Sequence, residues 1–87
     1  MTSLEKQITV HVHHGVHGRV ATGLAQIARQ YNVLIHILNE EELDCSSVLD
    51  VLSMGFASGD IVTFRIQGER AGPAMADVEQ LLGGREE

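Results

Sequence analysis

The stretch QITVHVHHGVHGRVATGLAQIARQ, residues 7–30, changes its hydrophobic period halfway along. Over Gln7–Val12 apolar and polar residues alternate, which predicts a strand with one buried face. After Gly15 the apolar residues fall at helical spacing, which predicts an amphipathic helix from about His17 to Gln30. The change of period therefore places His17 at a helix start.

The rest of the chain continues with short strand and helix patterns. Ser47-Val48-Leu49-Asp50 matches a capping box, and Gly55 is suited to end the short helix that follows. Pro73 is suited to the first position of a last helix, which we expect to end at Gly83-Gly84. The further elements expected are strands over 33–38, 42–45 and 61–66 and helices over 48–53 and 73–82.

This order of elements is β-α-β-β-α-β-α. It predicts an α+β fold, an open-faced β-sandwich in which a four-stranded antiparallel sheet carries three helices on one face. Eighty-seven residues with 44% apolar content suffice for one compact core. Residues 1–87 are therefore expected to form a single domain.

Composition narrows the classes of function. A formal charge of −6, with two phenylalanines, one tyrosine and no tryptophan, offers neither the basic stripe nor the stacking aromatics of a nucleic-acid binder. No apolar run approaches the roughly 20 residues of a membrane span, and the N-terminus lacks a signal-peptide pattern. The single Cys45 cannot form an internal disulfide, which fits a reducing compartment. We therefore expect a cytoplasmic protein without membrane insertion.

His17 has the surroundings of an anion-binding nucleophile. A helix start offers unpaired backbone N–H groups and a positive dipole end, which suit a phosphoryl group or another anion. The same positive end disfavours the imidazolium form, so a neutral, nucleophilic imidazole is favoured. Arg19 could place its guanidinium on phosphoryl oxygens, while Gly15 and Gly18 permit a close approach. The same features also fit an ordinary polar helix start with a solvated arginine.

The histidines before His17 suggest a rival interpretation. His11 and His13 lie two apart on a strand and could chelate a divalent ion, with His14 or Cys45 as a remote third ligand. No second cluster with zinc-like spacing follows, so we expect no resident metal and no other cofactor. A small metal-binding module remains an alternative from a different functional class.

Two motifs, GVHGRVA at 15–21 and SVLDVLSMG at 47–55, together resemble one known family. The first is similar to the Gly-Leu-His-x-Arg-Pro-Ala pattern around the phosphorylated histidine of HPr, the histidine-containing phosphocarrier of the bacterial sugar phosphotransferase system. The second is similar to the regulatory-serine helix of that family. The resemblance covers nearly the whole chain, from Lys6 to Leu82, and identifies a divergent member.

The resemblance implies that His17 accepts a phosphoryl group through Nδ1, while Gly18, Arg19 and Val20 hold that group. Enzyme I, charged from phosphoenolpyruvate, would be the donor, and an enzyme IIA domain of the sugar-uptake system would be the acceptor. The protein would then be a substrate of phosphotransferases rather than an enzyme with turnover of its own.

The second motif implies a regulatory site and a surface for partners. Ser47 matches the serine that HPr kinase/phosphorylase modifies in Gram-positive members, although the same residue also fits an ordinary helix N-cap. Val48 and Leu49 form an apolar patch, which is either partner-facing or the inner side of a short helix. If transport partners are absent, a regulatory paralogue on the same scaffold is the alternative.

The chain departs from the family pattern at several positions. Val20 stands where proline is usual, and Gly18 where threonine, serine or alanine is frequent, so the active loop would be less preorganised. Where members often carry lysines toward enzyme I, this chain has uncharged or acidic residues and one main basic residue: Gln26, Ser46, Asp50 and Arg29. Weaker electrostatic steering toward an acidic partner is therefore expected.

Overall fold

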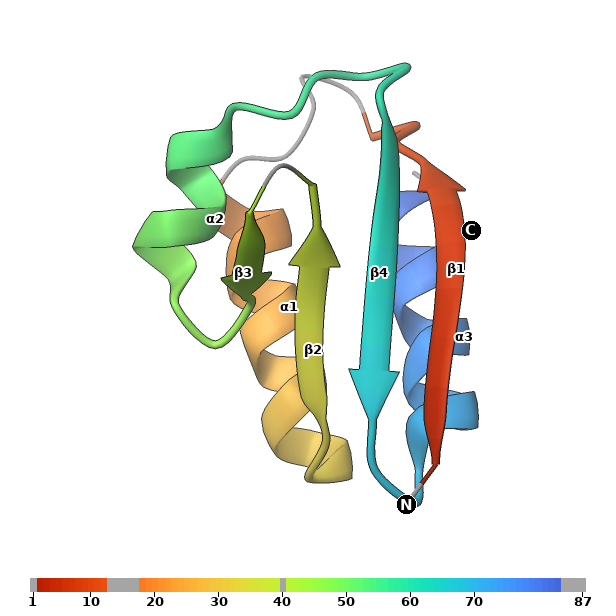
Figure 1. The fold of residues 1–87 in the computed structure, drawn as a ribbon. Helices are drawn as coiled ribbons and strands as arrows, with labels where there is room; N and C mark the ends of the chain where they lie inside the picture. The colour runs from red at the N-terminus through yellow and green to blue at the C-terminus, as the bar shows by residue number, and fades with distance from the viewer. Residues whose placement is uncertain (1, 13–17, 40, 84–87) are drawn as a thin grey trace.

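The computed structural model describes residues 2–12, 18–39 and 41–83, and it has two layers, with helices covering one face of a sheet (Figure 1). The predicted order of elements is confirmed. The elements are β1 (Ser3–Thr9), α1 (Gly18–Tyr31), β2 (Leu34–Leu38), β3 (Glu42–Asp44), α2 (Val48–Met54), β4 (Ile61–Gln67) and α3 (Ala71–Leu82).

The four strands form one antiparallel sheet in the order β1-β4-β2-β3. The central strand β4 therefore pairs with β1 from the beginning of the chain and with β2 from its middle. In Figure 1, α1 and α3 lie behind the sheet, while α2 lies beside β3. The open-faced α+β architecture predicted from the sequence is confirmed.

The core between the layers is apolar. Strand β2 contributes Ile35 and Ile37, strand β4 contributes Phe64 and Ile66, and α1 contributes Leu24, each at most 1% exposed. Within the described residues no polar or charged residue is buried as a whole. The charged side chains of the described residues are therefore all at least partly exposed at the surface.

Strand β1 differs from its predicted bounds of 7–12, because it begins at Ser3 and ends at Thr9. Its first residues are exposed, so no apolar alternation marks them in the sequence, and pairing with β4 makes them a strand. Val10 lies beyond the strand but is fully buried, and its N–H donates to the Asp60 carbonyl at 2.8 Å. The predicted buried face of this segment is therefore correct although the strand's ends are not.

The capping box predicted at Ser47 is wrong in its hydrogen bonds. Ser47 is the N-cap residue of α2, but its side chain makes no capping bond. The turn before α2 is instead held by Asp44, whose Oδ1 accepts the N–H of Ser46 at 2.9 Å and whose carbonyl accepts that of Ser47 at 3.1 Å. Asp44 thus holds the turn that leads into α2, but it does not accept the first-turn N–H groups that the serine was expected to bind.

Helix α3 begins at Ala71, so Pro73 is its third residue rather than its first. The position is still compatible with proline, because N–H groups of the first turn have no partner within a helix.

Three of the described glycines, Gly55, Gly59 and Gly68, have positive φ angles, and the first and last of them reverse the chain beside a helix. Gly55 ends α2 as predicted, with φ 66° and its N–H directed at the Leu52 carbonyl. Gly68, between β4 and α3, has φ 143°, and a Cβ there would lie 2.8 Å from Cγ1 of Val33. Both chain reversals therefore depend on the missing side chain.

Candidate functional site

The first turn of α1 carries three of the predicted site residues, Gly18, Arg19 and Val20. Gly18 and Arg19 are exposed, whereas Val20 is 3% exposed and belongs to the core. His17, with His13, His14 and Gly15, lies outside the described residues. The structure therefore describes the first turn of α1, which follows His17 in the chain, and shows how α1 lies on the sheet.

The amphipathic pattern of α1 explains why this helix packs closely against the rest of the fold. Its buried residues form one stripe against the sheet and α3: Val20, Ala21, Leu24, Ala25, Ile27 and Ala28. No acidic residue occupies the first turn, so the positive end of the helix dipole is left uncompensated there. First-turn N–H groups have no acceptor within their own helix, so with the exposed Arg19 this end of α1 is suited to an anion.

The two departures from the family pattern have different structural contexts. A Cβ at Gly18 would meet nothing within 4 Å, so the structure itself does not require glycine there. Val20 packs its side chain into the core and, unlike proline, has an N–H in the first turn. Val20 therefore adds a backbone N–H donor to the first turn of α1.

The patch predicted at the start of α2 divides into two parts. Val48 is partly buried and packs on the core, whereas Leu49 is 79% exposed. The inner-side alternative is confirmed for Val48, whereas Leu49 faces outward and its role toward a partner stays a prediction. Ser47 is half-buried beside them, with its hydroxyl not used in a helix cap. Helix α2 packs against both α1 and β3, so the two predicted motifs lie on adjoining elements.

The turn between β3 and α2 contains two groups whose titration is shifted. The N–H of Ser46 holds the pKa of the Asp44 carboxyl below its usual range, with a smaller contribution from His36. Burial raises the pKa of the Cys45 thiol to about 12, and this residue is fully buried. Cys45 is therefore unsuited to join the exposed His11 in a surface metal site.

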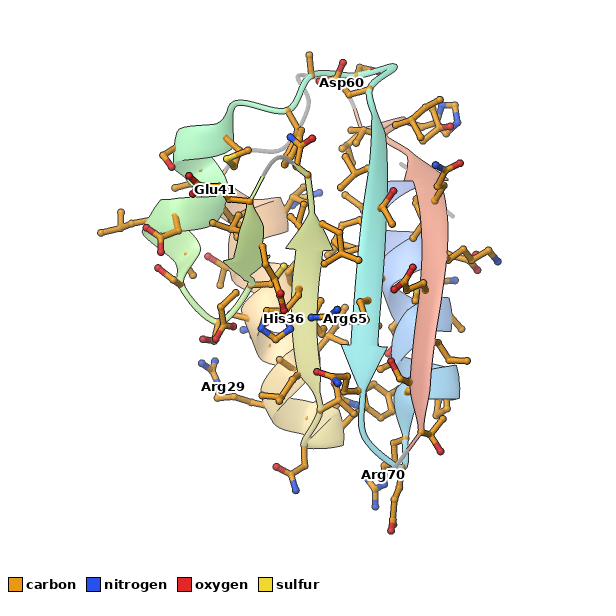
Figure 2. The ribbon with its side chains drawn as sticks, in the orientation of Figure 1. Arg29, His36, Glu41, Asp60, Arg65 and Arg70 are labelled. Carbon is orange, nitrogen blue, oxygen red and sulfur yellow. The ribbon has the colours of Figure 1, made fainter. Side chains whose placement is uncertain are left out.

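A charged network on the open face of the sheet was missed in the sequence. His36 on β2 lies opposite Arg65 on β4 and Asp44 on β3 (Figure 2). The Arg65 guanidinium donates to the Glu42 carboxylate, and His36 Nε2 lies 3.8 Å from the same Glu42 oxygen. The alternation in both strands signals an outward face for His36 and Arg65, but only the register shows that they meet.

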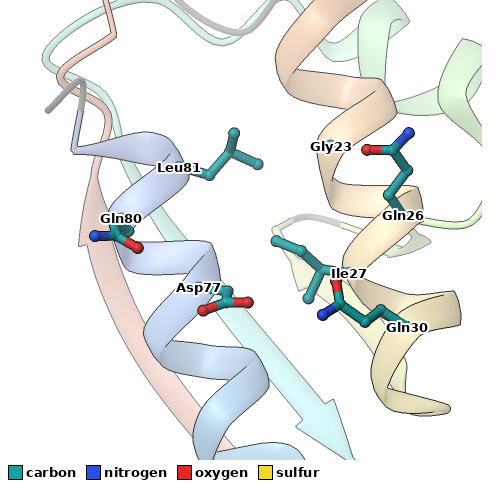
Figure 3. Close-up of a pocket in the computed structure, with 7 residues that line it drawn as sticks. All are labelled: Gly23, Gln26, Ile27, Gln30, Asp77, Gln80 and Leu81. Carbon is teal, nitrogen blue, oxygen red and sulfur yellow. The ribbon is translucent and has the colours of Figure 1, made fainter. Parts of the chain in front are cut away.

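A groove between α1 and α3 carries mainly carboxamide side chains (Figure 3). Gln26 and Gln30 come from α1, Gln80 and Asp77 from α3, around a floor that includes Ile27. Asp77 is engaged, because its Oδ2 accepts the Tyr31 hydroxyl at 2.7 Å. This groove joins the two helices and does not include the predicted site residues.

Comparison with known proteins places this geometry in a family. The family described as "PTS HPr component phosphorylation site" matches residues 4–83. The chain belongs to the HPr family. A similar relative is the phosphocarrier protein NPr of Shewanella violacea, 34% identical over 86 residues, which are 98% of this chain and 94% of the relative. The resemblance noted in the two sequence motifs is confirmed.

Two solved HPr structures show the same fold. The phosphocarrier protein HPr of Bacillus anthracis superposes with a TM-score of 0.83 at 19% identity, covering 94% of this chain and 99% of that one. HPr of Thermoanaerobacter tengcongensis superposes with a TM-score of 0.81 at 22% identity, covering 95% and 98%. Among the described residues of this HPr-family chain, no helix has the length and apolar character to cross a bilayer. The chain is thus a phosphocarrier-family protein of the phosphotransferase system.

Proposed function

We propose that the protein carries a phosphoryl group on His17, received from enzyme I and passed to an enzyme IIA-type domain in the cytoplasm. The observation that carries this proposal is the family match over residues 4–83, which spans the GVHGRVA motif at 15–21, and the last four residues of this motif begin α1. The first turn of α1, in which Gly18 and Arg19 are exposed and no residue is acidic, supports it because an anion is favoured there.

The reaction is an in-line transfer between two nucleophiles. The lone pair of the His17 Nδ1 attacks phosphorus while the bond between phosphorus and the donor group of phosphorylated enzyme I breaks, and the electron pair of that bond returns to the donor group. Arg19 and the first-turn N–H groups of α1 offset the negative charge of the phosphoryl group. The carrier contributes position and charge compensation, and the same steps run in reverse sense toward the acceptor.

Regulation at Ser47 is a second candidate function on the same scaffold. Its hydroxyl is half-buried and not used to cap α2, so its modification would not remove a capping bond. Incubation with ATP and an HPr kinase should add one phosphoryl group to the wild type and none to Ser47→Ala. Unchanged mass of the wild type would contradict this role.

The central experiment is phosphorylation by phosphoenolpyruvate and the enzyme I of the same genome, read as intact mass. The wild type should gain one acid-labile phosphoryl group, because phosphohistidine hydrolyses in acid. His17→Ala should gain none. His11→Ala, which removes an exposed histidine from the same segment, is the matched control and should behave as the wild type. An acid-labile gain that persists in His17→Ala would contradict the proposed acceptor.

A further inference from the structure

Strand β1 forms one edge of the sheet, across the sheet from α2. It lies outside β4, whereas α2 lies beside β3 at the opposite edge (Figure 1). The strand spans seven residues, Ser3–Thr9, and within the described part of the chain these residues pair with β4 alone. Their backbone N–H and C=O groups that point away from β4 therefore form an edge to which a further strand can be added.

The features that usually protect such an edge are weak in β1. A lysine on an edge strand discourages the addition of another strand, because its charge would have to be desolvated. Lys6 is the only lysine of the chain, but its ammonium group forms an ion pair with Glu79 of α3. The pairing with β4 is continuous from Ser3 to Thr9, without a bulge that would twist the edge away.

A groove lies beside this edge, between β1 and α3. Its apolar lining comes from Leu4 of β1 and from Gly72, Met75 and Ala76 of α3. Leu4 lies opposite the buried Ile66 of β4 and so faces the helix layer, but it is still 38% exposed. Side chains alternate between the two faces of a strand, so every second residue of an added strand places its side chain on the side of this groove.

The open face of the same edge carries a negative charge. Glu5 is exposed and lies opposite Arg65 of β4, but the Arg65 guanidinium donates to Glu42 on its other side. The ion pairs among the described residues do not include Glu5. A basic side chain opposite Glu5 in an added strand therefore meets a carboxylate that has no other ion-pair partner in this part of the structure.

We infer that the β1 edge binds an extended segment of a partner protein in which basic and apolar residues alternate. The backbone of the segment continues the sheet, its apolar side chains lie in the groove between β1 and α3, and a basic side chain lies opposite Glu5. The net charge of −6 favours the same basic partner. Because this edge lies across the sheet from α2, the interaction does not depend on the proposed phosphoryl transfer.

A second copy of this chain fits the edge less well. When two copies of a strand pair antiparallel in one continuous sheet, residues opposite each other lie on the same face. The residues that share the face of Glu5 are Ser3, Gln7 and Thr9, whereas Lys6 lies on the other face. Pairing of β1 with itself therefore places Glu5 opposite an uncharged residue or another Glu5, and its charge stays uncompensated.

A synthetic peptide tests the edge directly. The peptide Thr-Lys-Val-Lys-Val-Lys-Thr, with both ends blocked, is titrated into the full chain and followed by calorimetry and amide NMR. It should bind with shifts centred on β1 and the beginning of α3, and alternate amides of β1 should exchange their hydrogens more slowly. A peptide of the same composition, with its lysines and valines in separate blocks, should bind at least about 5-fold more weakly.

Three variants locate the contacts. Glu5→Lys should weaken binding of the alternating lysine peptide by about 3- to 10-fold, and it should bind a peptide with glutamate in place of lysine more tightly than the wild type does. Glu41→Lys is the matched control, because it makes the same charge change at an exposed residue next to β3, and it should stay within about twofold of the wild type. Leu4→Ala removes part of the groove and should weaken binding by about 3-fold.

The outcomes separate this inference from its rivals. Equal binding of the alternating and the block peptide would show attraction by charge alone and would overturn the inference, as would the absence of binding or shifts centred on α2. A dimer of the protein in sedimentation that Glu5→Lys alters and the peptide does not displace would assign the edge to a second copy and overturn the proposed occupant. Phosphorylation by enzyme I is measured separately, so failure here leaves the carrier function intact.

Discussion

Helices α1 and α2 carry the two halves of the candidate site, but they are held to the fold in different ways. Helix α1 spans 14 residues and buries six of them, whereas α2 spans seven and buries only Val51. The first is a fixed platform whose start is set by the core. The second is a surface element whose exposed side chains can change without loss of packing. Under the proposed function, the phosphoryl group would be held at the start of the more deeply packed helix.

The largest expected effect tests this contrast with the same substitution in each helix. Leu24→Ala in α1 empties a site that is 1% exposed, and it should lower the free energy of unfolding by about 2–5 kcal/mol. Leu49→Ala in α2 removes a side chain that is 79% exposed, and it should change that free energy by less than about 0.5 kcal/mol. Urea unfolding measures both. Similar losses in the two variants would show that α2 is held as firmly as α1.

A smaller effect is expected at the end of α2. Gly55→Ala forces a side chain into a left-handed conformation, which should cost about 1–2 kcal/mol. Gly72→Ala is the control, because it lies inside α3 with nothing within 4 Å of its new Cβ, and it should stabilise by about 0.4–1 kcal/mol. Thermal unfolding of both variants shows whether each substitution lowers or raises the stability of the fold. A neutral Gly55→Ala would mean that α2 ends without this constraint.

The smallest effect concerns the turn that leads into α2 and depends on pH. The pKa of Asp44 is lowered in the folded state, so its carboxylate stabilises the fold above its ordinary value of 3.8. This contribution is lost as the pH falls through the lowered pKa. Asp44→Asn should therefore be less stable than the wild type near neutral pH, and the difference should shrink in acid. A difference in unfolding free energy that stays constant from pH 7 to pH 3 would contradict this role.

The fold could be predicted because most helices and strands bury one face. Their apolar residues therefore recur in the sequence at the spacing of a helix or a strand. Helix α1 was expected over 17–30 and spans Gly18–Tyr31, and β2 and β3 agree to within one residue. The beginning of β1 could not be found in this way. Its residues from Ser3 to Gln7 are exposed and gain their structure from β4, which is distant in the chain.

The candidate site could be predicted only in part from the sequence. Sequence motifs located the starts of α1 and α2, and the structure shows that the Arg19 side chain is exposed and the Val20 side chain is buried. The hydrogen bond expected of the Ser47 side chain was wrong, and the turn before α2 is held by Asp44, three residues earlier. The network of His36 and Arg65 depends on strand register, which no local pattern specifies.

The turn at Gly68 limits how this chain can diverge. Its φ of 143° and the approach of Val33 leave no room for a side chain, and its N–H also binds the Thr2 carbonyl at 2.8 Å. The first strand, the second strand and the last helix are thus tied together at one point. During evolution the surface of α2 can drift toward new partners, whereas any residue at position 68 other than glycine would disturb all three elements at once.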